Sequence, residues 1–381
     1  MKIIIGADIV ATEKNEKYFV SGNVEKIVGR ELKTLLESSD FNIFNLEAPL
    51  INEECPIKKA GVCLKMSEEV LKGLQQLNIS LLTLANNHIM DQGTKGYNKT
   101  VELLKNANIP YVGVGNNVFE ASKGYIYEKQ NVRIGIYACA EHEFSIATEN
   151  SPGANPYDPL NSFDHINELK KNCDFLIVLF HGGKEYYRYP SPEIQKVFRK
   201  MAEKGADVVI SQHTHCVGCY EKYCNSLLLY GQGNFIFDRG NDEYWNSGLL
   251  LEINYENNSV SYNFVPIEKN HDGTISLSSN CCILNQFHDR STKIKSKDFV
   301  QKEYKKIVNE NFEYYLRIVN GNNLIFRILN KIVGGKLIFK LYSKKGELGL
   351  LNFIMCEAHR ELLINGLKDR NITKYESERS L

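Results

Sequence analysis

The feature that most constrains the fold is a run of apolar residues that ends abruptly in polar ones and recurs along the chain. Clear examples are residues 3–5, 81–85 and 175–180, which lead into an aspartate, an Asn-Asn-His triplet and a histidine. Continuous apolar runs are typical of parallel strands that are covered on both faces. Between them, residues 24–36 and 70–77 carry apolar residues at helical spacing. This alternation predicts an α/β fold.

The second half of the chain follows a different pattern. Apolar segments between residues 227 and 264 succeed one another without intervening helices, which predicts antiparallel strands that complete a second sheet. From about residue 292 the chain becomes rich in lysine and arginine and takes on helical spacing. We therefore expect a sandwich domain over residues 1–285 and a helical C-terminal extension over residues 286–381.

Arg327 and Lys331 in this extension interleave with large apolar residues, as in helices that lie on anionic membranes. A helix that packs its apolar stripe on protein shows the same pattern. We favour that interpretation, so peripheral membrane contact is not the expected role of the extension.

Charge and hydropathy exclude several classes. The chain has 46 lysines and arginines against 46 aspartates and glutamates, so no global field indicates a nucleic-acid partner. The first apolar run is too short for a signal-peptide core or for the roughly 20 residues that span a bilayer. The expected location is cytoplasmic, without a signal peptide or transmembrane segment.

Side chains suited to bind metal stand at the ends of five predicted strands. Carboxylates, imidazoles and an amide oxygen are typical ligands of Zn²⁺, Mn²⁺ and Fe²⁺. An isolated histidine is more often a satisfied core or surface residue, but convergence from five strands favours a site. The two histidines of His-Thr-His would point the same way in an extended chain. The candidates are Asp8, Glu47, Asn87 with His88, His181, His213 and His215.

The motifs that carry these residues resemble a known family. In chain order they are Gly6-Ala7-Asp8, Asn45-Leu46-Glu47, Ala85-Asn86-Asn87-His88 with Asp91 and Gly93, His181-Gly182-Gly183-Lys184-Glu185, residues 205–209, His213-Thr214-His215 and residues 230–235. Together they resemble the CapA, or poly-γ-glutamate capsule synthesis, family of the calcineurin-like metallophosphoesterase superfamily. The resemblance covers roughly residues 1–265, and several ordered motifs are more specific than any one.

The resemblance implies a four-layered α/β/β/α sandwich with two divalent ions in the crevice at the strand ends. It also implies a role for each residue: Asp8 and His215 as ligands of the first ion, Glu47 as the bridging carboxylate, Asn87, His181 and His213 as ligands of the second ion, and His88 as general acid or transition-state donor.

Three departures from the superfamily pattern change what is expected. Val10 stands where a histidine is usual, which leaves the first site one ligand short. Glu47 replaces the usual aspartate and reaches one methylene further. Gly183 stands where the family often has a tryptophan, which would open space near His181.

Two further acids are candidates for the catalytic site beside His88. Asp91 could hold the second nitrogen of His88 and fix its tautomer, or it could cap the helix that starts near Gly93. Glu185 could orient a ligand or bind a cationic group of the substrate. It could equally be a solvated glutamate paired with Lys184 or Arg188.

The resemblance implies a metal-dependent hydrolase of a phosphoester or amide bond, associated with capsule, poly-γ-glutamate or exopolysaccharide biosynthesis. Its partners would be a small-molecule or polymer substrate and capsule-synthesis proteins. The alternative is a non-catalytic assembly subunit of a polymer synthesis or export system that retains the fold.

Overall fold

The computed structural model describes residues 1–240, 242–256, 259–319 and 324–335, together with residues 337, 349–352, 354, 359 and 367. The chain divides into two units, Met1–Tyr304 and Lys305–Leu381. The boundary predicted at residue 285 falls inside helix α8 (Cys281–Lys293), whose contacts with strands β11 and β15 make it part of the first unit.

The first sheet has the strand order β16-β15-β14-β1-β2-β3-β4, and β13 also pairs with β1. Strands β1 to β4 are parallel, whereas β14, β15 and β16 are antiparallel additions. β4 lies at the edge, where Pro110 just before it is tolerated. The strands are β1 (Lys2–Val10), β2 (Phe41–Leu46), β3 (Leu81–Thr83), β4 (Tyr111–Val112), β13 (Asn234–Phe237), β14 (Ser247–Glu256), β15 (Ser259–Lys269) and β16 (Ile275–Leu277).

The second sheet has the order β11-β12-β10-β9-β7-β6. Its strands are β6 (Tyr125–Lys129), β7 (Val132–Ala140), β9 (Phe175–His181), β10 (Val208–Gln212), β11 (Tyr220–Tyr223) and β12 (Ser226–Leu229). A two-stranded sheet joins β5 (Val114–Gly115) and β8 (Gly153–Ala154).

The expectation that the late strands complete the second sheet was wrong in part. β11 and β12 do join it, with β12 parallel to β10, but β13, β14 and β15 extend the first sheet. In β14, Leu250 packs toward the helices, and Leu249 and Leu251 pack between the sheets. Because β14 is buried on both faces, it can pair with β1, which is equally buried. This explains why β14 joins the first sheet rather than the second.

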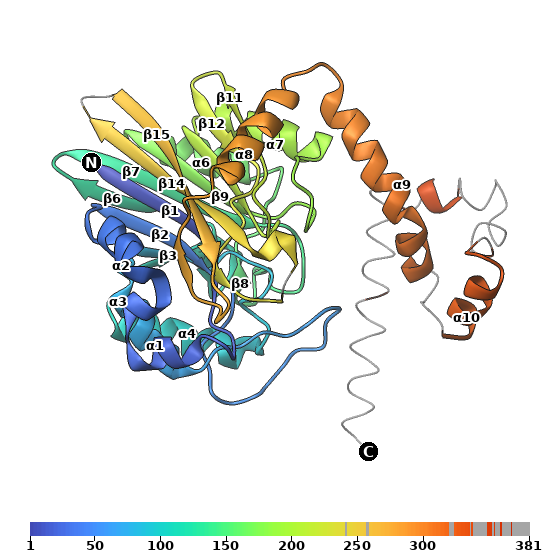
Figure 1. Cartoon of the computed structure of the whole chain (residues 1–381), viewed down its shortest axis with the longest axis horizontal. Helices are drawn as coiled ribbons and strands as arrows, with labels where there is room; N and C mark the ends of the chain where they lie inside the picture. The colour runs from blue at the N-terminus through green and yellow to red at the C-terminus, as the bar shows by residue number, and fades with distance from the viewer. Residues whose placement is uncertain are drawn as a thin grey trace. The chain divides into compact units, whose positions relative to one another are not determined.

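Three apolar clusters define four layers. Ile4, Phe44 and Leu82 of the first sheet pack against the first group of helices. Ile5 and Ile177 belong to a second cluster, which lies between the two sheets. A third cluster joins the outer face of the second sheet to the second group of helices through residues such as Val178, Ile166 and Phe198. The predicted α/β/β/α sandwich is therefore confirmed, as Figure 1 shows.

The helices fall on the two outer faces. One face carries α1 (Glu16–Ser21), α2 (Val24–Glu37), η1 (Glu68–Val70), α3 (Leu71–Gln76) and α4 (Gly93–Asn106); the other carries α6 (Ser162–Lys170) and α7 (Pro192–Glu203). Two short helices, α5 (Val118–Ala121) and η2 (Glu243–Trp245), lie in loops. Ser191 caps α7 by accepting a hydrogen bond from the backbone N–H of Ile194, with Pro192 in the first turn.

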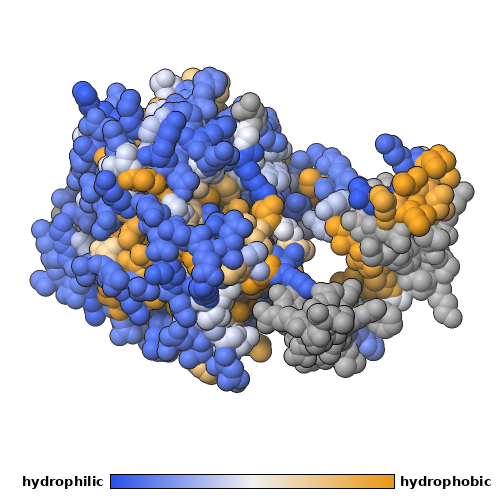
Figure 2. Space-filling view, turned by 90° about the horizontal axis from the view of Figure 1, so that it is seen from below, coloured by the Kyte–Doolittle hydropathy of each residue, from blue (hydrophilic) through white to orange (hydrophobic). Residues whose placement is uncertain are grey.

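Beyond the sandwich, most of the described residues are helical, as predicted. α9 (Phe299–Val319) is followed by α10 (Leu324–Ile332), which exposes Leu324, Ile325 and Ile332 to solvent. Figure 2 shows hydrophobic side chains on this part of the chain, in contrast to the largely hydrophilic surface of the sandwich. Among the described helices, none combines the length and hydropathy that crossing a bilayer requires. Residues 350–367 of the predicted helical extension lie largely outside the described residues.

Candidate metal centre

Asp8 is placed by an irregularity in β1. The strand pairs with β14 up to Ile5 and with β13 from Asp8, and its register with β2 shifts between the same two residues. At Gly6, a Cβ atom would lie 2.3 Å from the Phe44 ring, so only glycine fits there. The register shift turns the fully buried Asp8 carboxylate toward the carboxyl ends of both sheets.

Glu47 follows β2 and is fully buried, yet neither of its carboxylate oxygens has a hydrogen-bond partner among the described residues. Its Oε1 lies 3.3 Å from Nε2 of His181. Burial raises the pKa of Glu47 to about 8, and burial together with Glu47 raises the pKa of Asp8 well above its usual range. Two buried carboxylates without enough donors form a site that a cation would stabilise.

Two asparagines that the sequence argument did not select hold this acidic pair in place. Asn45 Nδ2 donates to Asp8 Oδ1 at 2.7 Å and lies 3.3 Å from His181 Nδ1. Asn86 Nδ2 donates to Asn45 Oδ1 and to the carbonyl of Leu46. β2 contains two buried asparagines, Asn42 and Asn45, and a buried amide needs partners, but the sequence does not show which of the two faces the site.

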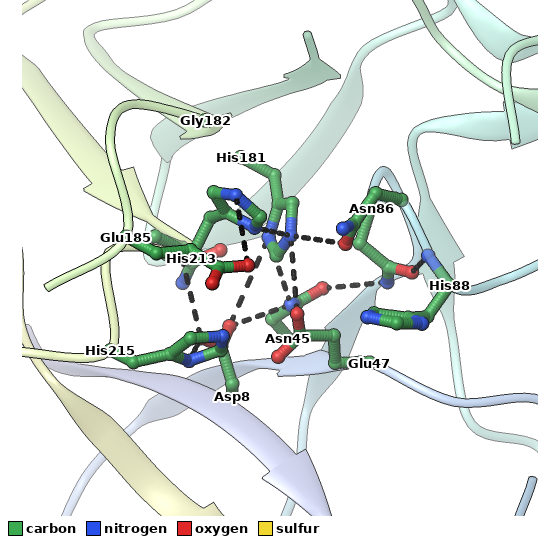
Figure 3. Close-up of polar contacts among 12 residues, drawn as sticks. Asp8, Asn45, Glu47, Asn86, His88, His181, Gly182, Glu185, His213 and His215 are labelled. Carbon is green, nitrogen blue, oxygen red and sulfur yellow. Dashed lines mark hydrogen bonds and ion pairs between the residues drawn. The ribbon is translucent and has the colours of Figure 1, made fainter. Parts of the chain in front are cut away.

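Asn87 and His213 both lie against His181, and Figure 3 shows the two histidines together. His181 Nε2 lies 3.0 Å from Asn87 Oδ1 and 3.2 Å from His213 Nδ1. The amide nitrogen of Asn87 donates at 3.3 Å to both carboxylate oxygens of Glu143, so the amide oxygen faces the histidines. Glu143 is a further residue that the sequence argument missed.

His213 and His215 converge on the same point, but the predicted reason was wrong. They do not belong to an extended strand: both are in the left-handed region, with φ of 85° and 53°, in the turn after β10. Non-glycine residues in this region usually carry strain, and such strain is common at functional sites. Glu47, His213 and His215 each place a potential ligand atom within 4.8 Å of the other two.

The imidazoles are suited to act as neutral ligands. Burial lowers the pKa of His181 and of His213 well below the usual value, and it lowers the pKa of His215 to about 3. Nδ1 of His215 lies 2.8 Å from Oδ1 of Asn234. That contact favours the tautomer with a proton on Nδ1 and leaves Nε2 as the nitrogen that can ligate.

The predicted contact between His88 and Asp91 is confirmed. His88 Nδ1 lies 2.5 Å from Asp91 Oδ2, and both residues are buried. Asp91 does not cap helix α4, for which Gln92 is the N-cap residue and no side-chain cap is formed. Because Nδ1 faces Asp91, Nε2 is the nitrogen of His88 that can face a bound substrate.

Glu185 is at the rim of the cluster, with Oε1 3.8 Å from His213 Nε2 and its side chain about one-third exposed, at 37%. Among the described residues, Lys184 Nζ donates to the backbone carbonyl of Glu185, and Arg188 pairs with Glu243 instead. The expected surface pair between the Glu185 carboxylate and Lys184 or Arg188 is not among these contacts.

Val10 and Gly183, two of the three positions that depart from the superfamily pattern, have well-defined environments. Val10 is 3% exposed and belongs to the apolar layer under the helices. Gly183 has a φ of 103°, and a Cβ atom there would contact Thr214 at 3.3 Å, so its backbone conformation favours glycine.

The four layers and the cluster of acids, imidazoles and an amide at the strand ends define a metallophosphoesterase-like sandwich. A family model for the bacterial capsule synthesis protein PGA_cap matches residues 3–239. The chain therefore belongs to this capsule synthesis family.

Two relatives that match the chain are named for capsule or PGA biosynthesis. The chain is 32% identical over 250 residues to the capsule biosynthesis protein CapA of Bacillus anthracis and 30% identical over 243 residues to the PGA biosynthesis protein CapA of Bacillus subtilis. The matches cover 63% and 62% of this chain. They cover 61% and 63% of the two relatives, so the chain spans less than two thirds of their length.

Solved structures with similar architecture share little sequence. A putative 5′-nucleotidase from Staphylococcus aureus is 15% identical, with a TM-score of 0.44, over 76% of this chain and 58% of that one. The NAD nucleotidase of Haemophilus influenzae is 14% identical, with a TM-score of 0.43, over 81% and 60%. The assignment of the fold rests on the layers described above.

Proposed function

We propose that this protein is a divalent-metal-dependent hydrolase of phosphoester bonds. The observation that carries the proposal is the Glu47 carboxylate, which is buried without a hydrogen-bond donor and faces His213 and His215. A divalent cation would supply the missing positive charge, and neutral imidazoles supply the remaining ligands.

The residues of the cluster would supply different numbers of ligands to two ions. Asn87, His181, His213 and Glu47 would hold the second ion with four protein ligands. Asp8, His215 and the shared Glu47 would hold the first with three. The mixture of oxygen and nitrogen donors without a thiolate fits Mn²⁺, Fe²⁺ or Zn²⁺.

Bound divalent ions would supply a water of lowered pKa and neutralise charge on a phosphoryl group. His88 would protonate or hydrogen-bond the leaving oxygen through Nε2, because Asp91 holds its other nitrogen at 2.5 Å. Glu185, at the rim beside His213, would orient that ligand or bind a cationic group of the substrate.

The setting of the reaction follows from the family. The relatives are named for capsule and PGA biosynthesis, and a relative in Mycobacterium tuberculosis that is 26% identical is named a probable polyglutamine synthesis accessory protein. We infer that this chain acts on a small-molecule or polymer substrate in the synthesis of a capsule, of poly-γ-glutamate or of an exopolysaccharide, beside capsule-synthesis proteins. An amide bond of such a polymer is the second candidate substrate.

One observation favours a different function. Val10 is buried in an apolar layer where the superfamily usually has a metal-binding histidine. A protein with a weakened first site could serve as a non-catalytic assembly subunit that keeps one structural ion.

The test is hydrolysis of bis(p-nitrophenyl) phosphate in the presence of Mn²⁺, with γ-glutamyl-p-nitroanilide as the amide probe. We expect phosphodiester hydrolysis that His88→Ala lowers by roughly 10²- to 10⁴-fold. His271→Ala, an exposed histidine outside the cluster, is the matched control and should retain activity. Hydrolysis of the amide alone would redirect the proposal to that bond, and turnover of neither probe by the metal-loaded protein would favour the assembly subunit.

A further inference from the structure

A buried lysine lies behind the His88–Asp91 pair. Lys59 has a side chain only 2% exposed, although lysine is almost never buried without a partner. Its Nζ lies 2.5 Å from Asp91 Oδ1, donates to the backbone carbonyl of Asn87 at 3.3 Å and lies 3.2 Å from His88 Nδ1. All three contacts are with residues of the proposed site.

The position of the proton on the His88 ring determines whether Lys59 can donate a hydrogen bond to Nδ1. If Nδ1 of His88 donates its proton to Asp91 Oδ2, it has no lone pair to offer the ammonium. Lys59 then forms an ion pair with Asp91 Oδ1 and donates a hydrogen bond to the carbonyl of Asn87. The two oxygens of Asp91 are thereby held from two sides, by an ammonium and by an imidazole.

Anchoring of the surrounding loop does not require the ammonium. Residues 52–65 form a long irregular stretch that is tied to the segment after His88 by other hydrogen bonds. The backbone N–H of Ile57 donates to the carbonyl of Asp91, and that of Leu64 donates to its carboxylate. Gln92 also exchanges hydrogen bonds with Cys55 and Leu64. Long loops without secondary structure are often functional.

We infer that Lys59 is a positioning residue of the metal centre, an inference that rests on the proposed hydrolase function. Its ammonium fixes the Asp91 carboxylate and, through it, the orientation of the His88 ring. It also holds the backbone of Asn87, whose side chain is a proposed ligand. The loop of residues 52–65 follows Glu47 in the chain and thus connects that carboxylate to His88 and Asp91.

The test compares Lys59→Met with Lys65→Met. Lys65 lies in the same loop, but it donates to the carbonyl of Asn52 and pairs with Glu54, and its side chain is 30% exposed. For bis(p-nitrophenyl) phosphate with Mn²⁺, Lys59→Met should lower kcat by about 10-fold or more while KM and bound Mn²⁺ stay near wild type. Lys65→Met should leave kcat within about two-fold.

A double-mutant cycle separates positioning from a general loss of structure. If Lys59 acts through His88, Lys59→Met should change kcat by less than about two-fold in the His88→Ala background. An equal loss in both backgrounds, or no loss in the wild-type background, would overturn the inference. If Lys59→Met fails to fold, Lys59→Arg, which keeps the charge but moves the donors, takes its place and should show the same dependence on His88.

A crystal structure of Lys59→Met tests the inference without any activity. It should show that the His88 Nδ1 to Asp91 Oδ2 contact is lost or that the ring has rotated. An unchanged contact would refute the positioning role. If the wild type hydrolyses no substrate, the proposed function fails, and this structure still decides the role of Lys59.

Discussion

At the scale of single residues, the site depends on groups that orient ligands rather than bind an ion. Asn87 and His215 each have two atoms that could face the cluster, and a hydrogen bond selects one of them. Glu143 occupies the amide nitrogen of Asn87, and Asn234 occupies Nδ1 of His215. Such partners commonly change metal affinity or activity when they are removed.

Replacement of Glu143 by alanine should therefore weaken Mn²⁺ binding by roughly 10-fold, because the Asn87 amide could rotate its nitrogen toward the ion. Isothermal titration of the metal-free protein with MnCl₂ measures the change. Glu149→Ala is the matched control, an exposed acid in the same loop region, and should bind as wild type does. Equal affinity in all three proteins would show that Glu143 does not orient the ligand.

At the scale of secondary-structure elements, α8 closes one end of the layer between the sheets. Phe287 is fully buried there, with ring centroids 5.2 Å from Tyr220 of β11 and 4.8 Å from Phe264 of β15. Arg290 of the same helix donates to the carbonyls of Gly218 and Val217. These contacts bring α8 into the sandwich, although the sequence alone suggested a boundary at residue 285.

Phe287→Ala should lower the free energy of unfolding by about 3 to 5 kcal/mol, since a large aromatic side chain would leave a cavity between the sheets. Urea denaturation followed by circular dichroism measures it. Leu160→Ala, at a position that is 82% exposed, should change stability by less than about 0.5 kcal/mol. A similarly small effect of Phe287→Ala would place α8 outside the cooperative unit.

At the scale of the whole molecule, the four layers could be predicted from the sequence, whereas several residues of the candidate site could not. Asp8 and His181 could be selected because apolar runs stop at them. Asn45 could not, since its role depends on which face of β2 meets the second sheet. The turn at His213 depends on left-handed backbone angles that no periodic pattern signals, and Lys59 lies in an irregular loop.

The two sheets are also joined at the end opposite the strand termini that carry the site. Asp40, just before β2, accepts a hydrogen bond from the backbone N–H of Lys2 in the first sheet at 2.6 Å. Its other oxygen lies 2.5 Å from Nζ of Lys129 in the second sheet. The hydrogen bond from Lys129, followed by that from Lys2, lowers the pKa of Asp40.

This link predicts a pH-dependent contribution to stability. A carboxylate whose pKa is lowered on folding stabilises the protein above its unfolded pKa of about 3.9, and the contribution is lost as the pH falls through the folded value. Asp40→Asn should therefore lower the melting temperature at neutral pH, and its difference from wild type should shrink below about pH 4. Asp289→Asn, which removes an exposed pair with Lys293 in α8, is the control. A difference independent of pH would contradict the role of the Asp40 charge.

The central claim is that the cluster around Glu47 binds divalent metal. The most direct measurement is the metal content of the full chain purified without chelator, determined by mass spectrometry for the wild type and for His213→Ala. The account predicts one to two Mn²⁺, Fe²⁺ or Zn²⁺ ions per wild-type chain and a clear loss in His213→Ala, because that imidazole lies 3.2 Å from His181 and has a ligand atom within 4.8 Å of the Glu47 carboxylate. A wild-type protein that holds no divalent ion, and takes up none from added MnCl₂, would contradict it.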